Sequence, residues 1–397
     1  MALSKITTAS LADDSVTGAK IENNPTIAGN LTVSGEFIPS EAIANKNIII
    51  NGNFSVDQRG ITKSGGIHSG NGDYNLDKWT IEDSGNIDNL VMNITQHADT
   101  PNGFDGYCLK YQCKTVESAV AADEFYSLNQ YVESRNLQHL GFGTADAKSI
   151  TVSFWVKSSL TGTFGFSIYQ DDGGDIVSAP YTINSADTWE KKTLTFAGNT
   201  ADSPANDNTR GWKVQWGLWV GSNYNTTATS TWTTYSNARR FGGHVQNGLA
   251  TVDESTWQLA FVQVEAGSTA TAFEHETYDE TLRKCQRYFV MDKAGSAYKR
   301  YLQGICTTTV WTECLYYYPV PMRAQPSIGS SGNNGHYLVE YYSNSAAASE
   351  APSRSSHSSE TYCCVNIRVA SGLTAGDNVA ITSYNTTDGY LSYNADF

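Results

Sequence analysis

A repeated alternation of apolar and polar residues limits the fold of this sequence more than any other feature. Between positions 150 and 156 every second residue is apolar, and residues 212–220 repeat the pattern with tryptophans. Successive side chains of a β-strand point to opposite faces of a sheet, so a period of two predicts strands buried on one face. Similar stretches occur at 107–113, 164–168, 194–196 and 259–264. Many such strands, joined by loops rich in Gly, Asn, Asp and Ser, predict an antiparallel β-sandwich of the jelly-roll type.

The composition supports an all-β fold and argues against two classes of partner. Among 397 residues there are 23 Tyr, 14 Phe and 9 Trp, and only 17% are charged. Aromatic side chains favour strands. The net charge of -14 argues against nucleic acid, because binding phosphates needs clustered Lys and Arg. It also argues against attraction to an anionic membrane, and no stretch approaches the roughly 18 apolar residues that insertion requires.

The seven cysteines predict reduced, mostly buried thiols. Their number is odd, and no Cys-x-x-Cys pair suggests a metal site or a disulfide framework. The first residues lack the apolar run of a signal peptide. We therefore expect synthesis in a reducing cytoplasm.

One short stretch, 276–289, carries a strong helical signal. Thr277 and Glu280 have the spacing of a capping box, in which each satisfies a backbone N–H of the other. Three apolar residues follow at i, i+3 and i+7 and form one narrow stripe. The stripe consists of Leu282, Cys285 and Phe289. We expect this helix to link two β domains, with the stripe forming a seam between domains or between subunits.

The sequence divides into four parts on this basis. An extended segment, 1–45, precedes the sandwich at 46–275, and the helix at 276–289 leads to a smaller C-terminal β domain at 290–397. In the first segment apolar residues recur every five positions, which fits neither a coiled coil nor a strand. One copy has too little apolar surface to fold alone, so we expect several copies to wind together or to lie on a partner. A disordered tail is the alternative.

Two phrases bracket the predicted sandwich. They are NIIINGNFSVDQRG at 47–60 and FVQVEAGSTATAFEHETYDETLRKCQRYF at 261–289. Together they resemble tail-fibre proteins of tailed bacteriophages, in which such phrases enclose a carbohydrate-binding-module-like jelly roll. The segment ASLADDSVTGAKI near the start is similar to the attachment segments of the same proteins.

The resemblance implies a homotrimer in the virion. Residues 1–45 would attach it to phage tail, baseplate or portal-region proteins. The C-terminal domain would then meet the host, binding a cell-surface glycan or an outer-membrane protein.

Aromatic side chains at polar positions of strands, or near loops, are the candidate glycan contacts. A sugar ring has apolar C–H faces that pack on a flat aromatic ring, while its hydroxyls bond to Asp, Asn and Gln. The alternative is that these rings face a neighbouring subunit or a second layer of the fold. The candidates are Trp155, Tyr169 and Trp219 in the sandwich and Trp311, Tyr317, His336 and Tyr341 in the C-terminal domain.

Motifs for catalysis are missing from the sequence. It contains no Gly-x-Ser-x-Gly elbow, no His-Glu-x-x-His and no P-loop. Acidic pairs such as Asp123/Glu124 are unavoidable among 40 acidic residues, so they do not indicate a glycosidase. The aspartates of the 171–175 turn could hold a structural Ca²⁺, although a solvated turn is the simpler interpretation. We expect no other cofactor and no metal.

The sequence therefore predicts binding without bond cleavage, and two alternatives stay open. A polysaccharide depolymerase tailspike would require a long β-helix with regular repeats, which this sequence lacks. A purely structural virion protein, such as a head fibre, decoration protein or tail connector, would have no host ligand.

Overall fold

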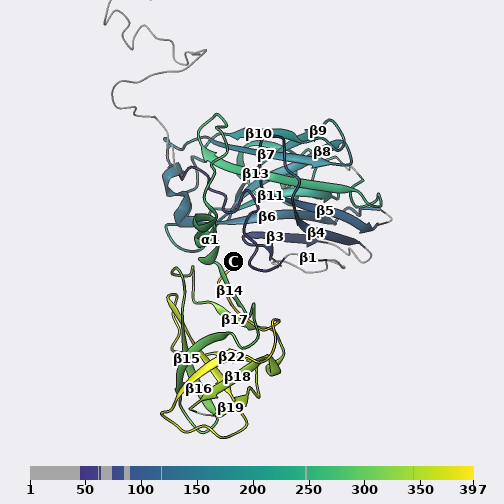
Figure 1. The fold of residues 1–397 in the computed structure, drawn as a ribbon. Coiled ribbons are helices and arrows are strands. Elements are labelled where there is room, and N and C mark those ends of the chain that lie inside the picture. Colours follow the sequence, from purple (N-terminus) through teal and green to yellow (C-terminus); the bar gives the residue numbers. More distant parts are fainter. Residues whose placement is uncertain are drawn as a thin grey trace, which may run out of the picture. The chain divides into compact units, whose positions relative to one another are not determined.

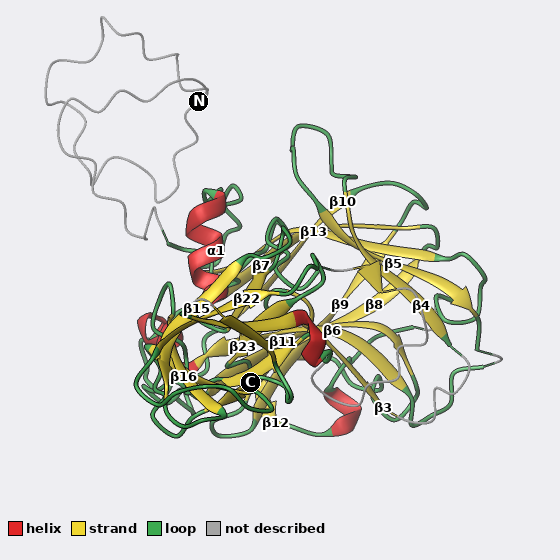
Figure 2. Cartoon of the chain, turned by 60° about the horizontal axis from the view of Figure 1, so that its bottom comes forward, coloured by secondary structure: helices red, strands yellow, loops and turns green. Residues whose placement is uncertain are grey.

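The computed structural model describes residues 45–60, 62–63, 74–84, 90–117, 119–245, 248–342 and 344–397. The predicted attachment and trimerisation segment therefore lies almost wholly outside the described residues. Where the chain is described, it forms antiparallel sheets with one α-helix and three short 3₁₀ helices (Figure 2). The 3₁₀ helices are η3 (Ser134–Leu140), η4 (Asn237–Arg239) and η5 (Asn334–His336). The predicted all-β class is confirmed.

Two sheets face each other in the sandwich (Figure 1). The six-stranded sandwich sheet has the spatial order β1 (Thr62–Lys63), β4 (Val91–His97), β5 (Cys108–Thr115), β13 (Thr256–Ala266), β7 (Ile150–Ser158) and β10 (Glu190–Phe196). The seven-stranded sandwich sheet has the order β12 (Thr229–Thr234), β9 (Asp175–Ile183), β8 (Gly162–Gln170), β11 (Arg210–Val220), β6 (Phe125–Glu133), β3 (Trp79–Ser84) and β2 (Tyr74–Leu76). All of these strands pair antiparallel with their neighbours, as predicted.

Aromatic side chains from both sheets meet in the sandwich core. Phe154 of β7 meets the ring of Trp216 on β11 edge-to-face at 5.8 Å, and Phe166 of β8 approaches the same ring at 5.0 Å. Such pairs add about 0.5–1.5 kcal/mol each beyond the burial of apolar area. The predicted alternation along β7 is confirmed, because Val152, Phe154 and Val156 are all buried in this core.

The chain itself covers part of the outer face of the seven-stranded sandwich sheet. Arg240, from the segment between β12 and β13, donates two hydrogen bonds to the side-chain oxygen of Gln215 at 3.0 and 2.7 Å. Beside it Phe241 packs with Phe125 and Tyr224 in a small separate cluster. The buried side chain of Gln215 on this face therefore has a partner within the chain.

The predicted helix is α1 (Tyr278–Gln286), and its capping box is present. Thr277 Oγ1 accepts from the Glu280 backbone N–H at 3.3 Å, and the Glu280 carboxylate accepts from the Thr277 N–H at 3.0 Å. The predicted stripe differs in one respect, since Phe289 lies beyond the helix and begins a strand. Cys285 and Phe289 are buried and Leu282 is half-buried.

The C-terminal domain is a second, smaller sandwich. The small C-terminal sheet has the order β14 (Phe289–Lys293), β23 (Tyr390–Asn394) and β17 (Ser327–Ser330). The large C-terminal sheet has the order β19 (Asn344–Ala347), β18 (Tyr337–Tyr341), β22 (Asn378–Ser383), β15 (Arg300–Cys306), β16 (Trp311–Tyr317), β21 (Tyr362–Arg368) and β20 (Ser353–Arg354). Tyr316 of the large sheet stacks on Tyr393 of the small one at 4.4 Å, which places the core of the domain between the two.

Candidate ligand-binding face

Trp219, which we predicted as an outward glycan contact, is buried in the sandwich core. Its side chain is 1% exposed and stacks on Tyr126 at 4.3 Å with the rings nearly parallel. The prediction was wrong because the β11–β6 register shifts between Gly217 and Trp219. This β-bulge adds one residue to β11 and reverses which side chains face the core. Trp219 therefore offers no face to a sugar.

The other two sandwich candidates lie on different sheets. Trp155, on β7 of the six-stranded sheet, is half-buried against Phe104 with ring centroids 6.1 Å apart. Tyr169, on β8 of the seven-stranded sheet, is half-buried beside Tyr235 at 5.1 Å. They lie on opposite outer sides of the sandwich and do not form one site.

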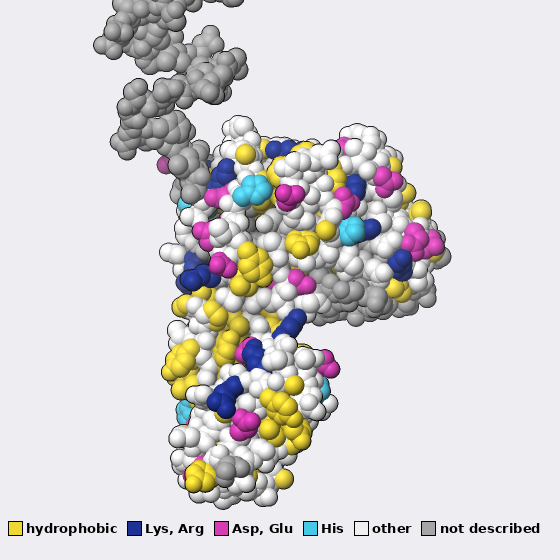
Figure 3. Space-filling model, in the orientation of Figure 1, with side chains coloured by type: hydrophobic (Ala, Val, Ile, Leu, Met, Phe, Trp, Pro, Cys, Tyr) yellow, Lys and Arg dark blue, Asp and Glu magenta, His cyan; other side chains and the backbone are white. Residues whose placement is uncertain are grey.

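One face of the large C-terminal sheet packs on the core and the other faces solvent; we call the latter the open face. Leu315 and Tyr317 of β16 are 43% and 70% exposed there, and Ile305 of β15 is 47% exposed. Figure 3 shows patches of hydrophobic side chains at the surface of the lower domain. Large apolar side chains gathered on one exposed face indicate a binding surface.

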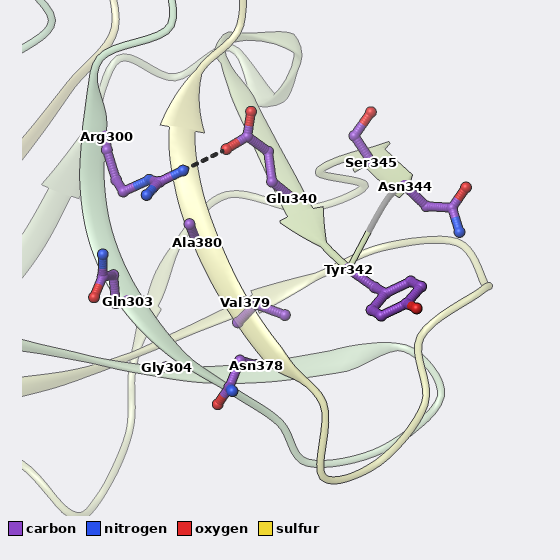
Figure 4. A pocket seen from close by; sticks show the side chains of 10 residues that line it. All are labelled: Arg300, Gln303, Gly304, Glu340, Tyr342, Asn344, Ser345, Asn378, Val379 and Ala380. Atoms are coloured by element: carbon purple, nitrogen blue, oxygen red, sulfur yellow. Dashed lines mark hydrogen bonds and ion pairs between the residues drawn. The ribbon is translucent and has the colours of Figure 1, made fainter.

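A groove of 810 Å³ crosses four strands of the open face, β15, β22, β18 and β19 (Figure 4). Its walls carry three side-chain amides, from Gln303, Asn344 and Asn378, so we call it the amide groove. Each amide offers both donors and acceptors without a charge. Arg300 and Glu340 form an ion pair at 3.2 Å in the same groove, which leaves this pair neutral.

Tyr342 lines the amide groove and is 98% exposed. It follows β18, and its φ of 49° lies in the left-handed region. A bulky side chain held there costs about 1–3 kcal/mol, and such strain gathers at functional sites. The structure thus exposes the neighbour of the predicted contact, since Tyr341 is half-buried against the domain core.

Glycine is required at the floor of the amide groove. A Cβ on Gly304 would collide with the backbone carbonyl oxygen of Glu313 on the adjacent strand. Gly304 therefore allows β15 and β16 to lie close together, so that the open face is continuous across the two strands.

A second groove, of 360 Å³, lies on the β16–β21 side of the open face. We call it the tryptophan groove, since Trp311 lines it together with Glu313, His357 and Asn366. The Glu313 carboxylate accepts from the Cys364 thiol at 2.9 Å and lies 2.9 Å from His357 Nδ1. These hydrogen bonds, of which the one from Cys364 contributes most, hold the pKa of Glu313 below its ordinary value. Burial raises the pKa of Cys364 to about 12, so this thiol stays protonated and donates.

Ser355, His357 and Glu313 have the residue types of a catalytic triad but a different geometry. In a triad one imidazole nitrogen faces the serine and the other faces the carboxylate. Here both the Ser355 hydroxyl, at 3.4 Å, and the Glu313 carboxylate, at 2.9 Å, face Nδ1. The arrangement suits hydrogen bonding to a ligand and does not activate the serine.

The aspartates considered for Ca²⁺ have protein partners. Asp171 pairs with Arg210, and Asp172 accepts from the backbone N–H of Ala205 at 2.9 Å. Among the described residues no group of His, Cys, Asp or Glu side chains could hold a metal ion. In the same part of the chain no helix is both long and apolar enough to cross a bilayer.

Of the C-terminal candidates, Trp311 and Tyr317 lie on the open face. His336 is half-buried with Nδ1 2.9 Å from the Ser331 hydroxyl, and it lines neither groove. The sequence reasoning did not predict the groove amides, and of the adjacent pair Tyr341 and Tyr342 we predicted the one that is half-buried. The alternation along β15 could have placed Gln303 outward, but nothing local marks the others.

The chain matches no protein-family model and no curated protein sequence. Several solved structures are similar to it. The enzymatically active domain of tailspike protein 4 of bacteriophage CBA120 is 13% identical with a TM-score of 0.30, over 55% of this chain and 21% of that one. The module TmCBM61, in complex with β-1,4-galactotriose, is 10% identical with a TM-score of 0.29, over 56% and 99% of the two chains.

A family 11 carbohydrate-binding module from Clostridium thermocellum, in complex with a β-1,3-1,4-mixed-linked tetrasaccharide, is also similar. It is 9% identical with a TM-score of 0.27, over 54% of this chain and 99% of that one. The chain thus spans about a fifth of the tailspike domain and nearly the whole of the two modules.

Proposed function

We propose that this protein is a non-enzymatic, glycan-binding adhesin of a bacteriophage tail fibre and that it binds through the open face of its C-terminal domain. The amide groove is the observation that carries the proposal. It combines a fully exposed tyrosine ring with three uncharged amides, from Gln303, Asn344 and Asn378. A sugar presents apolar C–H faces for the ring and hydroxyls for the amides, which both donate and accept.

The proposed position of this protein in a virion is supported by the two sequence phrases, at 47–60 and 261–289, that resemble phage tail-fibre proteins. On that basis the protein is a homotrimer, made in the host cytoplasm and attached to the particle through residues 1–45. An open groove binds one sugar segment weakly. Three copies per fibre would strengthen attachment, because each bound copy raises the effective concentration of the next.

A purely structural virion role is the second candidate. The observation that favours it is the exposure of Ile305 and Leu315, which would suit a contact with another protein. In that case the open face would be covered in the particle and would bind no sugar.

The test is binding to an array of purified host-surface glycans, followed by titration of those that bind. Tyr342→Ala should lower the affinity about tenfold, which corresponds to the loss of about 1.4 kcal/mol. Tyr298→Ala is the matched control, since Tyr298 is also exposed (53%), has a φ of 60° and lines neither groove.

Equal losses in the two variants, or no glycan bound by the wild type, would contradict the proposal. Release of reducing sugar from a bound polysaccharide would contradict the non-enzymatic part and favour a depolymerase.

A further inference from the structure

The two grooves of the open face are joined by a row of residues that lie directly opposite one another. Asn378 of β22 pairs with Ile305 of β15, Ile305 pairs with Glu313 of β16, and Glu313 pairs with Asn366 of β21. Directly opposite residues in an antiparallel ladder point to the same face. Asn378 lines the amide groove, whereas Glu313 and Asn366 line the tryptophan groove. Ile305 alone separates them in this row.

A second row runs beside the first. It passes from Glu340 of β18 through Ala380 and Gln303, which also line the amide groove, to Leu315 of β16. Both rows therefore cross from β15 to β16 over an apolar residue that faces solvent. The floor between the grooves, Ile305 and Leu315, is open and uncharged.

The extent of this face suits a chain of sugars better than a single one. Seven strands lie side by side from β19 to β20. Neighbouring strands are about 4.8 Å apart, so six intervals span about 29 Å. A ligand that reaches both grooves must run across the strands.

The charges of the face favour a neutral ligand. Arg300 is paired with Glu340, and Arg368, whose guanidinium lies 5.6 Å from the Trp311 ring, is paired with Glu350. The Glu313 carboxylate sits in the tryptophan groove with hydrogen-bond donors around it. An acidic glycan would meet these carboxylates, whereas both guanidinium groups already have partners.

We propose that the ligand of the open face is a linear, uncharged polysaccharide that runs across the strands and occupies both grooves at once. Its sugars bind in the amide groove and against Trp311, and their C–H faces pack over Ile305 and Leu315. This inference rests on the proposed glycan binding and adds the class of ligand and its path.

The experiment measures affinity against ligand length. The probe is the polysaccharide selected on the glycan array, partly hydrolysed and separated into fragments from disaccharides upward, each titrated by calorimetry. Affinity should rise about tenfold or more once a fragment can reach both grooves, because the second contact becomes intramolecular. Trp311→Ala and Tyr342→Ala should each reduce the affinity of long fragments toward that of short ones.

The floor between the grooves gives a sharper test. Ile305→Asp should weaken binding of long fragments about tenfold, while short fragments that fill one groove bind as before. Val252→Asp is the matched control, because Val252 is similarly exposed (44%) but belongs to the sandwich. The mass of each variant in solution is measured by light scattering.

Four results would overturn the inference. Affinity that does not depend on length, or that favours acidic over neutral polysaccharides, would show single-site or anionic binding while leaving glycan binding intact. A fall in oligomeric state with Ile305→Asp would show that a second copy of the chain covers the floor. Absence of glycan binding by the wild type would remove both this inference and the proposed function.

Discussion

The guanidinium of Arg287 donates two hydrogen bonds to the buried carboxylate of Glu133, at 2.8 and 2.6 Å. Arg287 ends helix α1, and Glu133 is the last residue of β6 in the sandwich. The Tyr288 hydroxyl donates to the same carboxylate at 3.0 Å. The link between the helix and the sandwich is therefore a directional polar contact.

Loss of this contact should destabilise the protein. Among the described residues, Arg287→Ala leaves the fully buried Glu133 with an ion pair to Arg135 at 2.9 Å. Breaking a buried ion pair from one side costs about 3 kcal/mol. Chemical unfolding should show a loss close to this value, and Arg283→Ala, an exposed arginine of the same helix, should show almost none. Equal stability of the two variants would contradict the role of the pair.

Tyr342 should show a conflict between stability and binding. Asn tolerates the left-handed region better than an aromatic residue, so Tyr342→Asn should raise the free energy of unfolding by about 1 kcal/mol. The same substitution removes the exposed ring and should weaken glycan binding. Urea unfolding and glycan titration on one preparation would measure both effects. A variant less stable than the wild type would show that the backbone at Tyr342 is not strained.

His244 should make the fold less stable in acid. Burial lowers the pKa of its imidazole from 6.5 to about 3. Between these values the unfolded chain binds a proton that the folded chain does not. Its contribution is therefore fully present above pH 6.5 and is lost as the pH falls, by about 1.4 kcal/mol per pH unit.

The variant His244→Gln isolates this effect, because a Gln oxygen can accept from the Gly165 N–H as Nδ1 does at 3.1 Å. The free energy of unfolding in urea should be measured at about pH 7 and about pH 5. Its decrease between these values should be about 2 kcal/mol smaller in the variant than in the wild type. Parallel pH dependences would show that another group carries the acid sensitivity.

Trp219 should matter for the fold and not for the ligand. Trp219→Ala removes a buried ring and should cost about 3–5 kcal/mol. Trp155→Ala, which truncates a half-buried ring, should cost less. Thermal unfolding compares the two, and glycan affinity per folded molecule should equal wild type in both. A specific loss of binding in Trp219→Ala would restore its predicted role.

The fold was largely predictable because its signals are local. The alternation along β7 is set by one buried face, and the capping box of α1 needs only Thr277 and Glu280. Each of these patterns is contained within a few consecutive residues. Strand pairing and the packing of the two sheets then follow from the apolar faces.

The candidate site was only partly predictable because it depends on register. The bulge after Gly217 reverses the parity on which the Trp219 prediction relied. Tyr341 and Tyr342 are adjacent, and only the turn after β18 decides which ring is exposed. The amide groove joins Gln303, Asn344 and Asn378, which lie far apart in the sequence and meet through strand order. Trp311 and Tyr317 lie on the open face, because no register shift interrupts β16; their contact with a glycan stays a prediction.

β14 pairs with β23, the last strand of the C-terminal domain. The pairing places Phe289, where this domain begins, directly opposite Asn394, the final residue of β23. The polypeptide thus enters and leaves this domain at neighbouring points, beside the sandwich residues Arg59 and Tyr74, which contact Asp396 and Phe397. A substitution at this junction therefore acts on both ends of the C-terminal part at once, because β14 and β23 share one ladder.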